Sequence, residues 1–109
     1  MQRSMKISPL AAITLLLVTA LPAQAQTGAQ ALYAQSLAAN CASCHGTAGR
    51  ATEGASITSL AGLDKNYFTA QMRAFKSGMR PATVMHQLSK GYSDAQIDAM
   101  AVYFAAQKP

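Results

Sequence analysis

The stretch Cys41-Ala42-Ser43-Cys44-His45 decides how the rest of this chain is interpreted. Two thiols three positions apart, followed at once by an imidazole, match the C-x-x-C-H pattern of a c-type haem attachment site. Cys41 and Cys44 would form thioethers with the two vinyl groups of the porphyrin, and His45 would supply the proximal iron ligand. The pattern therefore predicts one covalently attached haem c.

Two other chemistries use closely spaced cysteines. A zinc site needs a second pair of ligands at one of the usual spacings, and the sequence offers none. A thioredoxin-like redox motif needs a strand and a βαβ context, and no strand-like alternation of apolar and polar residues is present. Haem attachment is therefore the interpretation that spacing and context favour.

The N-terminus is typical of an exported protein. Residues 1–6 are basic, residues 10–21 are apolar, and the stretch ending at Ala25 has the small residues that a signal peptidase recognises. The apolar run is shorter than the roughly 18 residues that a membrane-spanning helix needs. We predict a secretory signal peptide over residues 1–25, cleaved after about Ala25. The mature chain would then have no membrane span and would lie in the periplasm.

Residues 26–109 are expected to form one domain. With three Phe, four Tyr and no Trp, the chain has little aromatic surface to bury, so a large apolar cofactor would supply missing core. The formal net charge of the chain is +5, and it falls to +3 without Arg3 and Lys6 of the signal. No basic run is interleaved with aromatic residues, so we expect no nucleic-acid binding.

Apolar periodicity predicts an all-α domain with three principal helices and one short helix around the haem. The expected segments are residues 31–40, residues 64–77, a short helix within residues 81–89, and residues 94–106. Asp64 is expected to cap the second segment and Gly78 to end it. Ser93 and Gln96 form a capping box for the last segment, and residues 26–30 are interpreted as a polar lead-in.

The segment from Gly46 to Gly62 contains four glycines and neither helical nor strand periodicity. A loop of this length in a small domain usually covers a ligand, here the haem. Ile57 and Leu60 are its expected inward-facing anchors.

An electron carrier also needs a ligand on the opposite face of the iron. The candidates are Met72, Met79, Met85, Met100 and His86. Met72 and Met100 lie on apolar helix stripes and are expected in the core, whereas Met79 lies on an expected exposed turn. Met85 follows Pro81 on a segment that returns to the domain before the last helix. We therefore predict Met85 as the distal ligand.

Several stretches resemble class I c-type cytochromes over nearly the whole mature chain. Besides the haem motif, they are Leu60-Ala61-Gly62, Phe75-Lys76-Ser77-Gly78, Arg80 to Met85 and Lys90-Gly91-Tyr92-Ser93-Asp94. They are similar to the cytochrome c4/c553 type and to the haem subunit of flavocytochrome c sulfide dehydrogenase. The resemblance implies the class I cytochrome c fold and assigns the distal methionine to the position of Met85.

The chain departs from this family at three positions. The family usually has a proline after the loop glycine, and its carbonyl accepts the Nδ1 hydrogen of the proximal histidine. Here Ala55 follows Gly54, and we expect the Ala55 carbonyl to take that role. Thr58 replaces a second common proline. His86 replaces a glycine after the distal methionine and is interpreted as an exposed side chain near the haem edge, with iron ligation as the alternative.

Three classes of function remain open. The resemblance implies the haem subunit of a flavoprotein dehydrogenase of the sulfide dehydrogenase type, which accepts electrons from an FAD-containing subunit. The alternative is a freely diffusing periplasmic carrier to a terminal oxidase or reductase, and the third class is a haem enzyme or sensor with an open iron position. Filling both axial positions with His45 and Met85 favours electron transfer without enzymatic activity. Lys76, Arg80 and Lys90 would steer an acidic partner, unless they form an ordinary solvated face.

Overall fold

The computed structural model describes residues 23–109, with side chains from residue 27 onward. The predicted signal peptide therefore lies, up to residue 22, outside the described residues. Over residues 23–109 the chain is helical and contains no strand, as the all-α prediction requires. The helices are α2 (Ala23–Ala39), α3 (Ala42–His45), α4 (Lys65–Ser77), α5 (Met85–Leu88) and α6 (Asp94–Ala105), with 3₁₀ turns η1 (Thr47–Gly49) and η2 (Ser89–Gly91).

The ends of α4 and α6 form as predicted. The Asp64 carboxylate accepts hydrogen bonds at 2.9 Å from two backbone N–H groups in the first turn of α4. Gly78, with a φ of 80°, ends that helix in the left-handed conformation. At α6, Gln96 N–H donates to the Ser93 hydroxyl, and Ser93 N–H donates to the Gln96 side chain. Local sequence therefore sets both helix starts.

The polar lead-in predicted for residues 26–30 is wrong, because these residues belong to α2. They lack an apolar stripe, and the prediction relied on such a stripe. Alanine and glutamine nevertheless have high helix propensity, and a helix exposed to water needs no apolar face where it makes no packing contact. The following part of α2 does pack, because Ala34 and Ala38 are buried.

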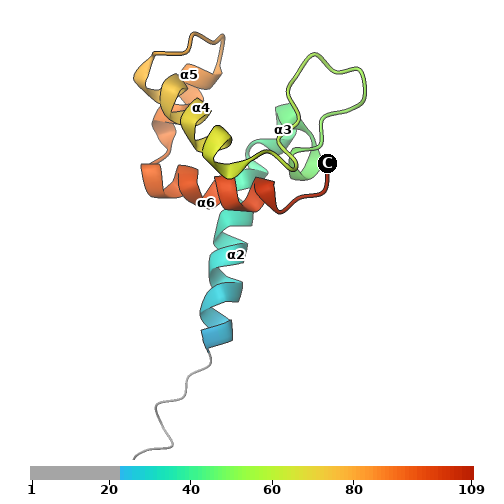
Figure 1. Cartoon of the computed structure of the whole chain (residues 1–109), viewed down its shortest axis with the longest axis vertical. Helices are drawn as coiled ribbons and strands as arrows, with labels where there is room; N and C mark the ends of the chain where they lie inside the picture. The colour runs from blue at the N-terminus through green and yellow to red at the C-terminus, as the bar shows by residue number, and fades with distance from the viewer. Residues whose placement is uncertain (1–22) are drawn as a thin grey trace, which may run out of the picture.

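The core lies where α6 crosses the other long helices. In Figure 1, α6 (red) runs across the middle, α2 extends away on one side, and α3, α4 and α5 lie on the other. The core cluster consists of Ala38, Phe68, Met72, Ile97, Met100, Ala101 and Phe104. The rings of Phe68 and Phe104 join α4 to α6, with their centroids 5.4 Å apart. No helix over residues 23–109 has the length and apolar character needed to cross a membrane.

Candidate functional site

The two cysteines and the histidine of the motif lie on one short helical turn. Cys41 is the N-cap of α3, and His45 ends it. His45 N–H donates to the Cys41 carbonyl at 2.9 Å, which closes the turn. Cys44 is exposed, and Cys41 packs partly against the core cluster. Both thiols are free, so the turn presents two thiols and an imidazole from one compact segment.

Burial is the main reason why the pKa of the Cys41 thiol is raised, and repulsion from Cys44 adds to it. The thiol form of Cys41 is therefore favoured over the thiolate. Conversion of both thiols to thioethers would remove this repulsion, because a thioether does not ionise. The electrostatics of the turn are thus compatible with covalent attachment at both sulfurs.

The His45 ring is held by the loop that follows it. Its Nδ1 lies 2.6 Å from the backbone carbonyl oxygen of Thr58. A carbonyl only accepts hydrogen bonds, so Nδ1 carries the hydrogen and donates it. The tautomer is therefore set, and Nε2 keeps its lone pair for a metal ion.

The expectation that Ala55 supplies this carbonyl is wrong, because the carbonyl belongs to Thr58. The prediction identified the loop position by the glycine that precedes it. The path of the loop decides instead which carbonyl faces His45. Thr58 stands at the second family proline position, and its carbonyl makes the bond without the proline ring.

The carbonyl of Gly49 keeps this part of the loop in place. It accepts from the Ser59 hydroxyl at 2.9 Å, from Leu60 N–H at 2.7 Å and from Ala61 N–H at 3.1 Å. These three donors follow Thr58 directly, so they fix the backbone that presents its carbonyl to His45. Leu60 also packs against the core as expected, whereas Ile57 is exposed and is not the inward anchor that we predicted.

The methionines predicted to lie in the core and the one predicted to be exposed are found where we expected them. Met72 and Met100 are in the core, with exposed fractions of 5% and 0%, and Met79 is 84% exposed. Met85 is the first residue of α5 and packs partly buried against the core cluster that Cys41 also contacts. Among the methionines of residues 27–109, Met85 is therefore the one that is neither enclosed in the core nor fully exposed.

His86 is partly buried, so the interpretation of an exposed side chain is wrong. Its Nδ1 atom is enclosed and has no hydrogen-bond partner among the described residues. The short turn of α5 therefore places a thioether and an imidazole at adjacent positions.

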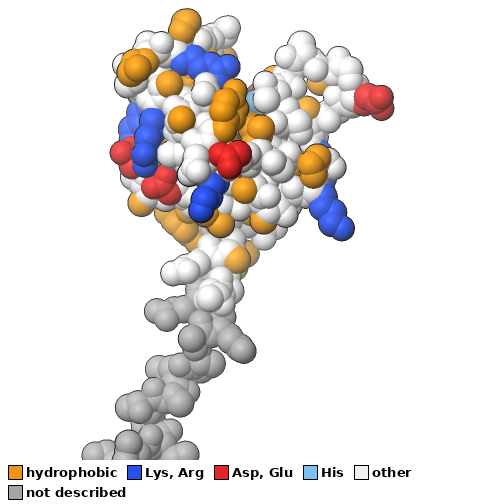
Figure 2. Space-filling model, viewed as in Figure 1, with side chains coloured by type: hydrophobic (Ala, Val, Ile, Leu, Met, Phe, Trp, Pro, Cys, Tyr) orange, Lys and Arg blue, Asp and Glu red, His pale blue; other side chains and the backbone are white. Residues whose placement is uncertain are grey.

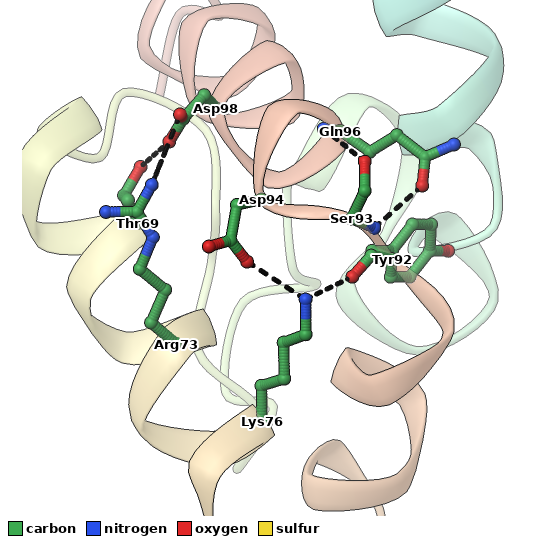
Figure 3. Close-up of polar contacts among 8 residues, drawn as sticks. All are labelled: Thr69, Arg73, Lys76, Tyr92, Ser93, Asp94, Gln96 and Asp98. Carbon is green, nitrogen blue, oxygen red and sulfur yellow. Dashed lines mark hydrogen bonds and ion pairs between the residues drawn. The ribbon is translucent and has the colours of Figure 1, made fainter.

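Residues 78–93, here called the Met85 segment, are fastened to α4 at both ends. At the start, Arg80 N–H donates to the Ala74 carbonyl at 3.1 Å, and the Arg80 guanidinium lies 4.5 Å from the centre of the Phe75 ring. At the end, Lys76 Nζ donates to the Tyr92 carbonyl at 2.8 Å and to the Asp94 carboxylate at 2.9 Å (Figure 3).

These contacts change the interpretation of the basic residues. Lys76 and Arg80 are engaged within the domain, and the Arg80 guanidinium also donates to the Gln71 side chain. Their first role is to hold the Met85 segment, and steering of a partner does not explain their positions. Lys90 is exposed on η2.

The Lys76–Asp94 pair predicts acid sensitivity of the fold. A hydrogen bond from Lys76, together with its positive charge, lowers the pKa of the Asp94 carboxyl below 3.8. The unfolded chain therefore takes up this proton first as the pH falls. The pair stabilises the fold above the unfolded pKa, and that stabilisation is lost as the pH falls through the folded pKa. We expect the urea midpoint of the protein to fall more steeply below pH 4 than that of Asp94→Asn.

Because both side chains are solvent-accessible, the effect should be small at high salt. Glu53→Gln, which removes a carboxylate from the exposed loop, is the matched control and should follow the unmodified protein. Parallel acid profiles for the unmodified protein and Asp94→Asn would contradict the prediction.

A notch separates the part of the molecule that contains α4 and α5 from the loop after α3. Figure 2 shows hydrophobic side chains along the side of this notch formed by α4 and α5. Val84 and Leu88, on either side of Met85 in sequence, are half exposed. The exposed apolar surface beside Met85 is the kind of surface that a large apolar cofactor would cover.

The donor set fits a c-type haem. Two thiols at the required spacing, an imidazole with a free Nε2 and a partly exposed thioether are present. A zinc site fits less well, because residues 23–109 contain no group of three or more His, Cys, Asp or Glu side chains placed to hold a metal ion. The residues therefore agree with the chemistry that the motif indicates.

The comparison with protein families decides the class. Residues 23–104 match the family model described as cytochrome c oxidase, cbb3-type, subunit III. The chain belongs to the cytochrome c family. This membership implies haem c as the cofactor and agrees with the all-helical fold.

The curated relatives of this cytochrome c domain are named as cytochromes or as an electron acceptor of a dehydrogenase. It is 35% identical over 90% of its length to a thiosulfate dehydrogenase electron acceptor from Stutzerimonas stutzeri, covering 46% of that protein. It is 34% identical over 88% of its length to cytochrome c4 from Pseudomonas aeruginosa, covering 47% of it. It is 38% identical over 62% of its length to the cytochrome subunit of sulfide dehydrogenase from Chlorobaculum tepidum, covering 60% of it. The chain thus spans about half the length of these relatives.

Proposed function

We propose that this chain is a periplasmic monohaem cytochrome c that carries single electrons and is not itself an enzyme. Cys41 and Cys44 are the thioether attachment points, His45 is the proximal ligand and Met85 is the distal ligand. The observation that carries this proposal is the 2.6 Å contact between His45 Nδ1 and the Thr58 carbonyl. It orients an imidazole beside two free thiols and leaves Nε2 available for iron.

The residues account for the main requirements of an electron carrier. A bound c-type haem would supply the one-electron couple of its iron. His45 and Met85 would both bind the iron, and no position on it would then be left for a substrate. The bonds at Gly49 hold the loop that contacts His45, and the contacts of Lys76 and Arg80 hold the Met85 segment. Because the protein would supply both iron ligands, no ligand would have to bind or leave when an electron is transferred.

For the donor, we propose a dehydrogenase that oxidises a reduced sulfur compound, with an FAD-containing sulfide dehydrogenase subunit as the first candidate. The relatives named as electron acceptor of thiosulfate dehydrogenase and as cytochrome subunit of sulfide dehydrogenase support this choice. The similarity to cytochrome c4 favours a second candidate, a freely diffusing carrier. Export through the signal predicted over residues 1–25 would place either form in the periplasm.

The experiment mixes oxidised holoprotein with a sulfide dehydrogenase flavoprotein and sulfide, and separately with a thiosulfate dehydrogenase and thiosulfate. We expect rapid one-electron reduction of the haem by one of the two systems, followed as the change in visible absorbance. The holoprotein mass should exceed that of the chain by one haem. Each dehydrogenase without its substrate is the control.

Co-elution of the two proteins in gel filtration would indicate a stable subunit, and reduction without co-elution would indicate the diffusing carrier. Immediate binding of carbon monoxide by the reduced protein would contradict both, because it requires an open iron position. No reduction in either system would contradict the proposed donor class.

A further inference from the structure

Ser89 is a fully buried polar residue at the C-cap of α5, with an exposed fraction of 0%. Its hydroxyl donates to the Met85 carbonyl at 2.7 Å. The same oxygen lies 3.7 Å from the sulfur of Met72, which belongs to the core of α4. Ser89 therefore links the backbone of Met85 to the core.

The Met85 carbonyl receives a second hydrogen bond from the same residue, because Ser89 N–H also points to it. The other backbone bonds of this turn are local, because Gln87 N–H and Leu88 N–H both donate to the Val84 carbonyl, at 2.9 Å and 3.1 Å. α5 has four residues, and its N-cap, Val84, makes no side-chain hydrogen bond. A helix this short has no stability of its own, so the position of Met85 depends on anchors such as Ser89.

Two other serines make the same kind of bond without the burial. Ser36 donates to the Tyr33 carbonyl at 2.7 Å, and Ser77 donates to the Ala74 carbonyl at 3.2 Å, both on exposed surfaces. Water replaces such a bond easily when it is lost. At Ser89 the donor is fully buried and the bond is partly buried, so water competes less for it and the interaction is stronger.

We propose that Ser89 is a positioning residue for the distal ligand. By holding the Met85 carbonyl from both its N–H and its hydroxyl, it keeps the Met85 thioether at the iron. This inference rests on the proposed function, in which Met85 is that ligand. Loss of the hydroxyl would let the thioether leave more often, and an external ligand would then compete for the iron more successfully.

The test is an imidazole titration of oxidised holoprotein, followed by loss of the near-infrared methionine-to-iron band. We expect Ser89→Ala to bind imidazole about tenfold more tightly, which corresponds to about 1.4 kcal/mol. Alanine keeps the backbone bond to Met85, so the variant should fold. Ser36→Ala removes a hydroxyl–carbonyl bond of the same length from an exposed surface and should titrate like the unmodified protein.

Met85→Ala separates failure of this inference from failure of the proposed ligand. If Met85→Ala retains the band, the distal ligand is wrong and the Ser89 role falls with it. If Met85→Ala loses the band while Ser89→Ala titrates normally, Ser89 is not a positioning residue and the proposed function stands. A lower urea midpoint for Ser89→Ala with an unchanged titration, or an equal shift in Ser36→Ala, would also overturn the proposal.

Discussion

Gly46→Ala is expected to prevent the segment that follows His45 from folding. Gly46 has a φ of 84°, and a Cβ atom added there would lie 1.7 Å from the carbonyl oxygen of Arg50. The backbone fixes the position of the added Cβ, and the Arg50 oxygen is itself a backbone atom, so no side-chain rotation relieves this contact. The turn from Gly46 to Arg50 would have to open, and with it the bonds at Gly49 that place the Thr58 carbonyl. We expect a loss of at least about 4 kcal/mol in the free energy of unfolding.

The measurement is urea unfolding of the holoprotein followed by circular dichroism, together with the yield of covalently bound haem. Gly54→Ala is the matched control, because Gly54 has a φ of 78° in the same loop but no atom within 4 Å of the added Cβ. It carries the backbone strain alone and should cost about 1–2 kcal/mol. Equal losses in the two variants would show that the Arg50 contact has no effect.

Phe104→Ala is expected to cost about 3–5 kcal/mol, a large part of the stability of a domain of this size. Phe104 is 0% exposed, and its ring packs against the ring of Phe68. It also packs edge to face against the Tyr103 ring, with the two ring centroids 5.2 Å apart. Its ring also closes over Gly49, where an added Cβ would lie 2.8 Å from it. Truncation would therefore leave a cavity that touches α4, α6 and the loop of residues 46–62.

Val102→Ala is the comparison for this variant, because Val102 lies on the same helix and is 61% exposed. It should change the free energy of unfolding by less than about 1 kcal/mol. Urea unfolding measures both variants. A shift in the midpoint reports a change in stability when the dependence of the free energy of unfolding on urea concentration is unchanged. Similar losses for the two substitutions would mean that Phe104 is not a central core residue.

Features that depend on neighbours in sequence were predictable. The Asp64 cap, the left-handed Gly78 and the Ser93–Gln96 box each involve residues within one helical turn, and all three form. The core placement of Met72 and Met100 followed from helical periodicity. In contrast, the helical start of α2 was missed because an exposed Ala- and Gln-rich helix leaves no apolar pattern.

Contacts between distant residues were not predictable in the same way. From the sequence, Lys76 is either a steering charge or part of a solvated face. Its bonds to Tyr92 and Asp94 depend on how α4 lies against the start of α6. Burial of Ser89 depends on α5 turning back over the core. A serine within a polar stretch gives no sequence signal of either burial or a bond to Met85.

By itself, the sequence determined which reactive groups are available and where α4 and α6 begin. It provides two thiols and an imidazole at haem spacing, a methionine on a returning segment, and helices with capping residues. Only the tertiary structure decided that the Thr58 carbonyl, and not that of Ala55, orients His45. It also decided that Lys76 and Ser89 hold the segment carrying Met85. The physical reason is the separation in sequence of the groups that interact. Caps and motifs act within a few residues, whereas the partner of a buried donor or of a folded-back loop depends on the path of the whole chain.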